Sequence, residues 1–117
     1  MSFPYTFSPA VQADIARILE TSEEEFGPAA RLRYAALINT ALSDIAANPY
    51  RVESRAWPEL GRGARSWHLQ LSRERARTPT GMVSQPRHII FYRIEAGVVI
   101  IERVLHERQD LRRKFAR

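Results

Sequence analysis

The chain has 117 residues, of which 44% are hydrophobic and 9% aromatic, and its formal net charge is +5. This length matches the commonest size of one domain, and the apolar content is too high for a chain that stays unfolded. No apolar run approaches the roughly 20 residues that cross a bilayer, and the first residues lack the pattern of a secretion signal. No cysteine is present. We therefore expect one cytoplasmic domain over residues 1 to 117, with no metal, cofactor or membrane span.

A short strand and a helix are expected at the start of the chain. Residues 4 to 8 alternate apolar and polar side chains, which is typical of a strand. Ser8 is a natural helix N-cap, and Pro9 suits the first helical position. The buried stripe predicted for this helix follows a 3.6-residue spacing and consists of Val11, Ile15, Ile18, Leu19, Ser22 and Phe26.

A second helix is expected directly after the first. Gly27 breaks the first helix, and Pro28 suits the first position of the next one. Asn48 and Pro49 end this second helix. The turn between the helices is very short, so the two helices must run antiparallel. The predicted buried stripe of the second helix consists of Ala35, Ile38, Leu42 and Ile45.

The middle of the chain predicts one strand between two irregular segments. Residues 49 to 64 show no sustained period and predict a connection, with a turn around Trp57. Residues 64 to 71 alternate apolar and polar side chains and predict a strand. Residues 72 to 86 are polar and predict a long basic loop. The apolar side of the strand consists of Trp67, Leu69 and Leu71.

The last part of the chain predicts a β-hairpin. Residues 88 to 94 and 98 to 105 are rich in Ile and Val, and the intervening Glu-Ala-Gly is a signal for a three-residue hairpin turn. Residues 108 to 117 predict a short helix or a frayed tail. The element order therefore predicts an α+β fold, with an N-terminal strand and an antiparallel two-helix hairpin packed on one face of a mostly antiparallel sheet of about four strands.

Several segments in this order form a recognisable pattern. Residues 87 to 93 read RHIIFYR, residues 103 to 106 read RVLH, and Asp110 follows four positions later. Together with the segment YTFSPA at residues 5 to 10 and the breaks after the two helices, this pattern resembles the ParE branch of the ParE/RelE toxin superfamily. The resemblance covers residues 5 to 112, although the loop at residues 72 to 86 is longer than in the smaller members.

The resemblance implies a growth-inhibiting toxin of a type II toxin-antitoxin system, of the kind that stabilises plasmids and chromosomes. Such a toxin is neutralised by a cognate antitoxin, whose acidic and apolar C-terminal tail folds on binding, so a hetero-oligomer is expected. ParE-like members resemble inhibitors of DNA gyrase that act by binding. RelE-like members cut messenger RNA on the ribosome, and a basic nucleic-acid-binding domain without toxicity is a third possibility.

The charges are segregated along the chain. Residues 1 to 60 hold five Lys and Arg against eight Asp and Glu, a net of −3, whereas residues 61 to 117 hold thirteen against five, a net of +8. The basic half is therefore the expected contact surface for an acidic antitoxin tail or for the target. The residues expected to bind are Arg73, Arg75, Arg77, Arg87, Arg93, Arg103, Arg108, Arg112, Arg113 and Lys114.

Cleavage of RNA would need a base for the 2′-hydroxyl, a cation for the developing phosphorane and an acid for the leaving oxygen. The candidates are Arg87, His106 and Arg108, with His88 and Tyr92 close to them in sequence. A hairpin that turns at residue 96 without a bulge would set His88 opposite Val104, with His106 one step diagonally away. Lys114 is the single lysine, so the lysine cluster typical of RelE ribonucleases is missing and the sequence favours binding over catalysis.

Overall fold

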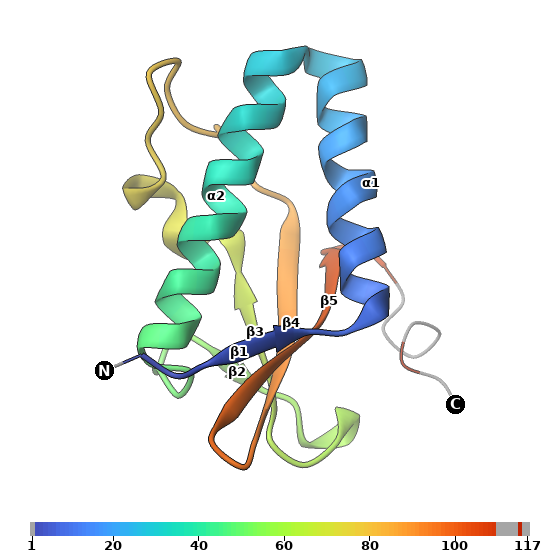
Figure 1. The fold of residues 1–117 in the computed structure, drawn as a ribbon, viewed down its shortest axis with the longest axis vertical. Coiled ribbons are helices and arrows are strands. Elements are labelled where there is room, and N and C mark those ends of the chain that lie inside the picture. The colour runs from blue at the N-terminus through green and yellow to red at the C-terminus, as the bar shows by residue number, and fades with distance from the viewer. Residues whose placement is uncertain (1, 110–114, 116–117) are drawn as a thin grey trace.

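The computed structural model describes residues 2 to 109 and residue 115. Two helices lie on one face of a five-stranded sheet with the strand order β1-β5-β4-β3-β2 (Figure 1). The strand β1 runs parallel to β5, and the other neighbours are antiparallel. The elements are β1 (Tyr5–Phe7), α1 (Pro9–Phe26), α2 (Pro28–Ala47), β2 (Arg55–Ala56), the 3-10 helix η1 (Pro58–Leu60), β3 (Ala64–His68), the 3-10 helix η2 (Leu69–Arg75), β4 (His88–Glu95) and β5 (Val98–His106).

This arrangement confirms the predicted α+β fold, with a fifth strand added. That strand, β2, lies in the connection between residues 49 and 64, which was expected to be irregular. The helix or tail predicted from residue 108 onward falls mostly outside the described residues. None of the helices in the described part of the chain is long and apolar enough to cross a membrane.

The starts and ends of both long helices follow the local signals in the sequence. The Ser8 hydroxyl accepts a hydrogen bond from the Val11 backbone amide at 3.1 Å and donates one to the Glu102 carbonyl at 2.7 Å. The N-cap of α1 is thereby also tied to β5. Gly27 takes a φ of 91° between the helices, a conformation that glycine adopts at little cost.

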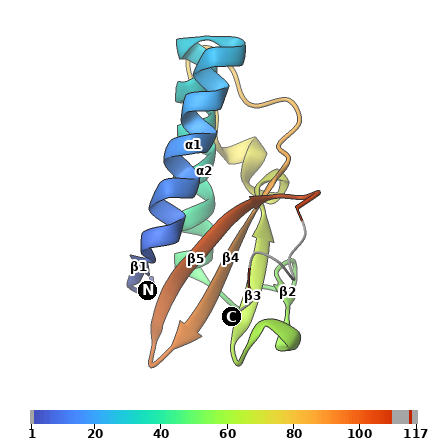
Figure 2. The ribbon, with the colours of Figure 1, turned by 90° about the vertical axis from the view of Figure 1, so that its right-hand side faces the viewer.

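The core lies between the two helices and the sheet (Figure 2). The stripe predicted for α2 is confirmed at Ile38, Leu42 and Ile45, which are all buried. The stripe predicted for α1 is wrong at its end, because 73% of Phe26 is exposed. The tip of the helical hairpin extends past the ends of the strands, so no sheet lies beneath this part of α1 (Figure 1).

The strand predicted for residues 64 to 71 ends early, at His68. The His68 Nδ1 accepts a hydrogen bond from the Gln70 backbone amide at 3.0 Å, and the chain turns there into η2. Leu69 is fully buried as a result, whereas Leu71 is partly exposed. Because a side-chain cap redirects the backbone, the alternating pattern does not continue as a strand.

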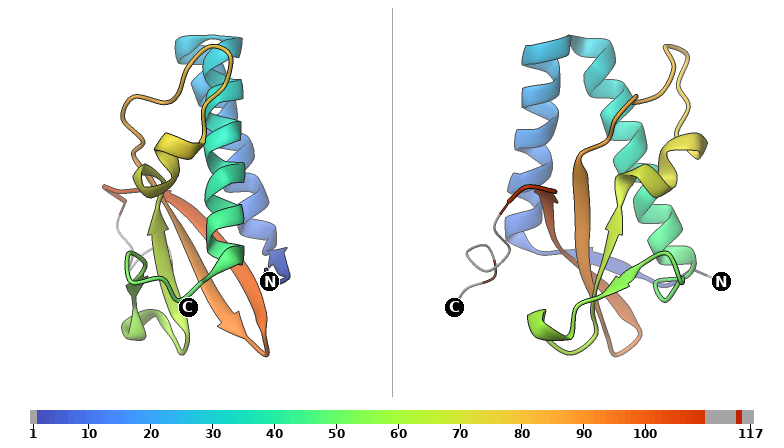
Figure 3. Two further views of the ribbon diagram at one scale, coloured as in Figure 1. Left: turned by 90° about the vertical axis from the view of Figure 1, so that its left-hand side faces the viewer. Right: turned by 180° about the vertical axis from the view of Figure 1, so that it is seen from behind.

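The loop after η2 lies beside α2 (Figure 3). The Arg33 guanidinium donates a hydrogen bond to the Thr80 hydroxyl at 3.0 Å, which holds the loop against the helix. The Arg73 Nε donates to the Val83 carbonyl at 2.5 Å, and residues 78 and 81 form an isolated β-bridge. The predicted long loop is therefore shortened by η2 and fixed by hydrogen bonds.

The β4–β5 hairpin differs from the expected register in two ways. Glu95 pairs with Val98, so the turn has two residues, both with positive φ, instead of three. A bulge between Phe91 and Tyr92 then shifts the pairing by one more position. As a consequence His88 lies directly opposite His106, not opposite Val104 as expected without a bulge.

Candidate functional site

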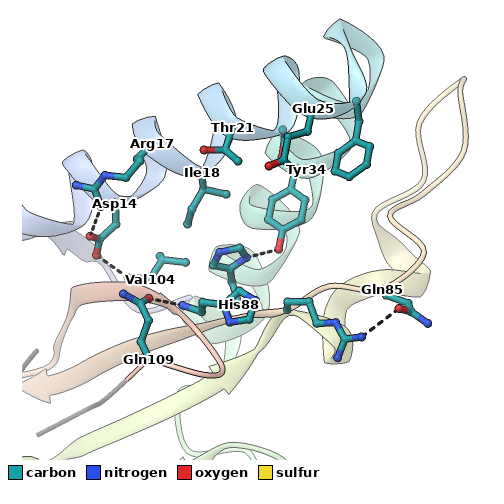
Figure 4. Close-up of a pocket in the computed structure, with 14 residues that line it drawn as sticks. Asp14, Arg17, Ile18, Thr21, Glu25, Tyr34, Gln85, His88, Val104 and Gln109 are labelled. Carbon is teal, nitrogen blue, oxygen red and sulfur yellow. Dashed lines mark hydrogen bonds and ion pairs between the residues drawn. The ribbon is translucent and has the colours of Figure 1, made fainter.

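A cleft of about 530 Å³ opens between α1 and the ends of β4 and β5 (Figure 4). His88, Val104 and His106 form its floor on the sheet side. Ile18 of α1 and Tyr34 of α2 form its walls on the helix side. The helical hairpin extends past the ends of the strands, so the sheet covers the inner side of α1 only in part (Figure 2). The remaining lining residues are Asp14, Arg17, Thr21, Ser22, Glu25, Phe26, Gln85, Arg87 and Gln109.

Two histidine rings meet on the floor of the cleft. The ring centroids of His88 and His106 are 5.3 Å apart and the rings are nearly perpendicular. The Tyr34 hydroxyl lies 2.6 Å from the His88 Nδ1. Burial, together with the neighbouring imidazoles of His106 and His68, lowers the pKa of His88 to about 4, and burial raises the pKa of Tyr34 to about 12. At neutral pH the imidazole of His88 is therefore neutral, and the protonated phenol donates to its Nδ1.

A charged network lies beside the cleft and includes Arg87 of its lining. The Glu107 carboxylate lies 2.9 Å from the His68 Nε2 and 2.9 Å from the Arg87 guanidinium. The His68 Nδ1 accepts the Gln70 amide proton, so in the neutral ring the Nε2 carries the proton and donates to Glu107. These hydrogen bonds from His68 and Arg87 lower the pKa of Glu107 to about 2. The carboxylate is therefore ionised throughout the physiological range.

A buried ion pair fixes α1 against β5 at the other end of the cleft. The Asp14 side chain is 2% exposed and accepts two hydrogen bonds of 2.8 Å from the Arg103 guanidinium. The Val104 backbone amide donates a third hydrogen bond to the same carboxylate at 3.0 Å. Sequence reasoning missed this pair, although Asp14 stands on the apolar face between Val11 and Ile18. A carboxylate on a buried helix face needs a cationic partner, and that signal could have found it.

The arginines expected to bind a partner differ in how far they are exposed. Three are mostly covered and held by internal contacts, namely Arg73 with Val83 and Glu74, Arg93 with Glu95 and Glu102, and Arg103 with Asp14. Three have half or more of the side chain exposed although each has an acidic neighbour, namely Arg75 with Asp44, Arg77 with Glu74, and Arg87 with Glu107. Arg108 is exposed, whereas Arg112, Arg113 and Lys114 lie outside the described residues.

The structure brings together part of the set expected for RNA cleavage. Arg87 and His106 both line the cleft. Arg108 does not line it, but its backbone amide donates to the His106 Nδ1 at 3.1 Å. Tyr92 is buried in the core and donates to the Pro49 carbonyl at 2.6 Å, as expected for a core aromatic residue. Among the described residues no group of three or more His, Cys, Asp or Glu side chains is placed to hold a metal ion.

Comparison with known proteins gives similarities over nearly the whole chain. The model of the family described as the ParE toxin of the type II toxin-antitoxin system parDE matches residues 5 to 111. The protein named Toxin ParE1, from two strains of Mycobacterium tuberculosis, is 31% identical over 116 residues, covering 98% of this chain and 100% of the relative.

Two solved structures are similar in fold. The chromosomal ParDE toxin-antitoxin system from P. aeruginosa gives a TM-score of 0.65 at 13% identity, covering 90% of this chain and 96% of that chain. The RelBE2 toxin-antitoxin complex from Mycobacterium tuberculosis gives a TM-score of 0.52 at 20% identity, covering 91% of this chain and 99% of that chain.

Proposed function

The chain belongs to the family of ParE toxins of type II toxin-antitoxin systems, and we propose that it arrests growth by binding a target in the cytoplasm, DNA gyrase, until a cognate antitoxin neutralises it. Both parts of this proposal, the target and the partner, go beyond family membership.

An acidic antitoxin tail is the partner that the charge distribution favours. The second half of the chain has a net charge of +8, and the arginines exposed on it include Arg77 and Arg108. A disordered acidic tail that orders on this surface would offset its loss of conformational entropy through charge-assisted hydrogen bonds. The two solved structures of similar fold are toxin-antitoxin assemblies, which supports the same kind of partner here.

Binding rather than hydrolysis is supported by the internal pairing of the ionisable groups in the cleft. The His88 Nδ1 accepts a hydrogen bond from the Tyr34 hydroxyl, and the Arg87 guanidinium pairs with the Glu107 carboxylate. The His106 Nδ1 accepts a hydrogen bond from the Arg108 backbone amide. General acid-base catalysis needs groups that can exchange protons with a substrate, whereas these side-chain atoms each face a partner inside the protein. The likeness to the ParE branch supports gyrase as the target.

Expression of the chain in growing bacteria, with and without the product of a neighbouring open reading frame, tests the proposal. We expect growth arrest by the chain alone, rescue by the acidic partner, and recovery of both proteins as one complex. The double variant Arg77→Ala/Arg108→Ala should weaken the complex by about three- to tenfold, because exposed charges steer and orient such partners. Arg62→Ala, which removes an exposed arginine from the turn before β3, is the matched control and should leave binding unchanged. Growth unaffected by the chain would contradict the proposal.

A RelE-like ribosome-dependent endoribonuclease is the second candidate, because Arg87 and His106 line one cleft. In a translating extract this activity would cut messenger RNA in the ribosomal A site, and His106→Gln would abolish the cleavage. If the chain acts by binding, the extract keeps its messenger RNA intact at concentrations of toxin that arrest growth.

A further inference from the structure

The amide side chains that line the cleft have their oxygen atoms occupied. The Gln109 Oε1 accepts a hydrogen bond from the His106 backbone amide at 2.6 Å. The Gln85 Oε1 accepts one from the Arg87 guanidinium at 3.2 Å. A backbone amide and a guanidinium can only donate, so the oxygen of each side chain must face them. Both side chains therefore keep their NH₂ groups, which are pure donors, for another partner.

The two histidines on the floor are arranged in the same way. The His88 Nδ1 accepts the Tyr34 hydroxyl proton, and the His106 Nδ1 accepts the amide proton of Arg108. In the neutral form each ring must then carry its own proton on Nε2. Within the described residues, these two rings and the two amide side chains therefore each present a hydrogen-bond donor, and each already accepts a hydrogen bond from inside the protein.

The carboxylates of the lining change this balance little. Both oxygens of Asp14 are taken by Arg103 and by the Val104 backbone amide. Glu25 is the remaining acidic residue in the lining, and it lies on α1 toward the tip of the helical hairpin (Figure 4). Between these two positions the cleft offers apolar surface from the half-buried Ile18.

We propose that this cleft binds a carboxylate side chain of a partner peptide, with an apolar neighbour of that residue resting on Ile18. A carboxylate only accepts hydrogen bonds, so it complements the donor groups of the two histidines and the two glutamines. The inference rests on the proposed function, because the acidic and apolar tail of an antitoxin would supply such a segment.

A carboxylate fits the cleft better than the phosphates of a nucleic acid. Arg17 and Arg87 are the cationic residues of the lining, and each has an acidic neighbour, Asp14 for Arg17 and Glu107 for Arg87. Phosphate backbones are held by several uncompensated cations, whereas neutral amide and imidazole donors suffice for one carboxylate. An acidic peptide is therefore the ligand, and an oligonucleotide is the contrasting probe.

The test is a two-dimensional NMR titration of the purified chain with the peptide acetyl-Leu-Glu-Leu-amide. Its isostere acetyl-Leu-Gln-Leu-amide, inorganic phosphate and the dinucleotide UpU serve as contrasting probes. We expect saturable shifts of the His106, Gln109 and Val104 signals with the glutamate peptide, and a Kd at least about tenfold weaker with the glutamine peptide. Equal affinity for the two peptides, or tighter binding of UpU or phosphate than of the glutamate peptide, would overturn the assignment.

Two variants of opposite expected effect locate the site. Gln109→Glu replaces a hydrogen-bond donor by a negative charge and should weaken binding of the glutamate peptide about tenfold. Glu25→Gln removes a negative charge and should strengthen binding of the same peptide two- to threefold. Gln70→Glu makes the same change as the first variant at an exposed position outside the lining and should leave the Kd unchanged. If all three variants bind alike, the cleft is not the site.

Failure of this inference can be told apart from failure of the proposed function. A chain that arrests growth and is rescued by its antitoxin, yet does not bind the glutamate peptide, would keep the function and refute the cleft as a carboxylate site. A chain that binds the peptide in the cleft but leaves growth unaffected would keep the site and refute the function.

Discussion

Replacing Asp14 by Asn tests whether its ion pair with Arg103 holds α1 against β5. The carboxylate is 2% exposed and accepts three hydrogen bonds, two from Arg103 and one from the Val104 amide. An Asn side chain has one acceptor oxygen, so at least one of these donors loses its partner and the guanidinium loses its counter-charge. Breaking a buried pair in this way costs about 3–5 kcal/mol. Because Arg103 is 20% exposed, water can reach it in part, and we expect the lower end, about 3 kcal/mol.

Thermal unfolding followed by circular dichroism measures this loss. For a domain of this size each kcal/mol lowers the Tm by roughly 4 °C, so Asp14→Asn should lower it by about 12 °C. Glu74→Gln is the matched control, because Glu74 is 70% exposed, pairs with Arg77 at the surface and should cost no more than about 1 kcal/mol. In the double variant Asp14→Asn/Arg103→Met the two losses of stability should be less than additive. A Tm for Asp14→Asn equal to that of Glu74→Gln would refute the structural role of the pair.

Two further predictions concern stability. The pKa of His88 is lowered from 6.5 to about 4, so as the pH falls the unfolded chain takes up a proton before the folded chain does. The free energy of unfolding should therefore fall by about 3 kcal/mol between pH 6.5 and pH 4. In urea-unfolding measurements over this pH range, His88→Asn, which keeps an acceptor for Tyr34, should reduce this pH dependence, and an unchanged pH dependence would contradict the assignment. Gly63 has a φ of +76°, and an added Cβ would lie 2.9 Å from the Ile94 carbonyl oxygen, whereas Gly81 has a φ of +107° and open space around it. Gly63→Ala should therefore lower the free energy of unfolding by about 2 kcal/mol more than Gly81→Ala does. Equal losses in the two variants would show that the contact with Ile94 is unimportant.

The sequence predicted the elements whose ends are set by local chemistry. Ser8, Gly27 and Asn48 delimit the two helices through their own backbone preferences and caps, so short windows of sequence suffice to place them. The end of β3 was predicted too late because the hydrogen bond from Gln70 to the His68 ring competes with the strand pattern. Side-chain caps of this kind leave the alternation of apolar residues intact and are invisible to it.

The candidate site was predicted only in part, because it depends on contacts between distant residues. The bulge at Phe91 and Tyr92 arises from pairing between two strands, and together with the two-residue turn it sets His88 opposite His106. The partner of Asp14 lies 89 residues away. The sequence located the basic half of the chain, but it could not show how far each arginine is exposed, because that depends on packing between distant residues, as for Arg103 with Asp14.

The most direct test of the proposed function is supercoiling of relaxed plasmid by purified DNA gyrase, titrated with the purified chain. Supercoiling should fall as the chain saturates gyrase, and the cognate antitoxin should restore it at a stoichiometric amount. Full supercoiling at concentrations of the chain well above those that arrest growth would contradict gyrase as the target.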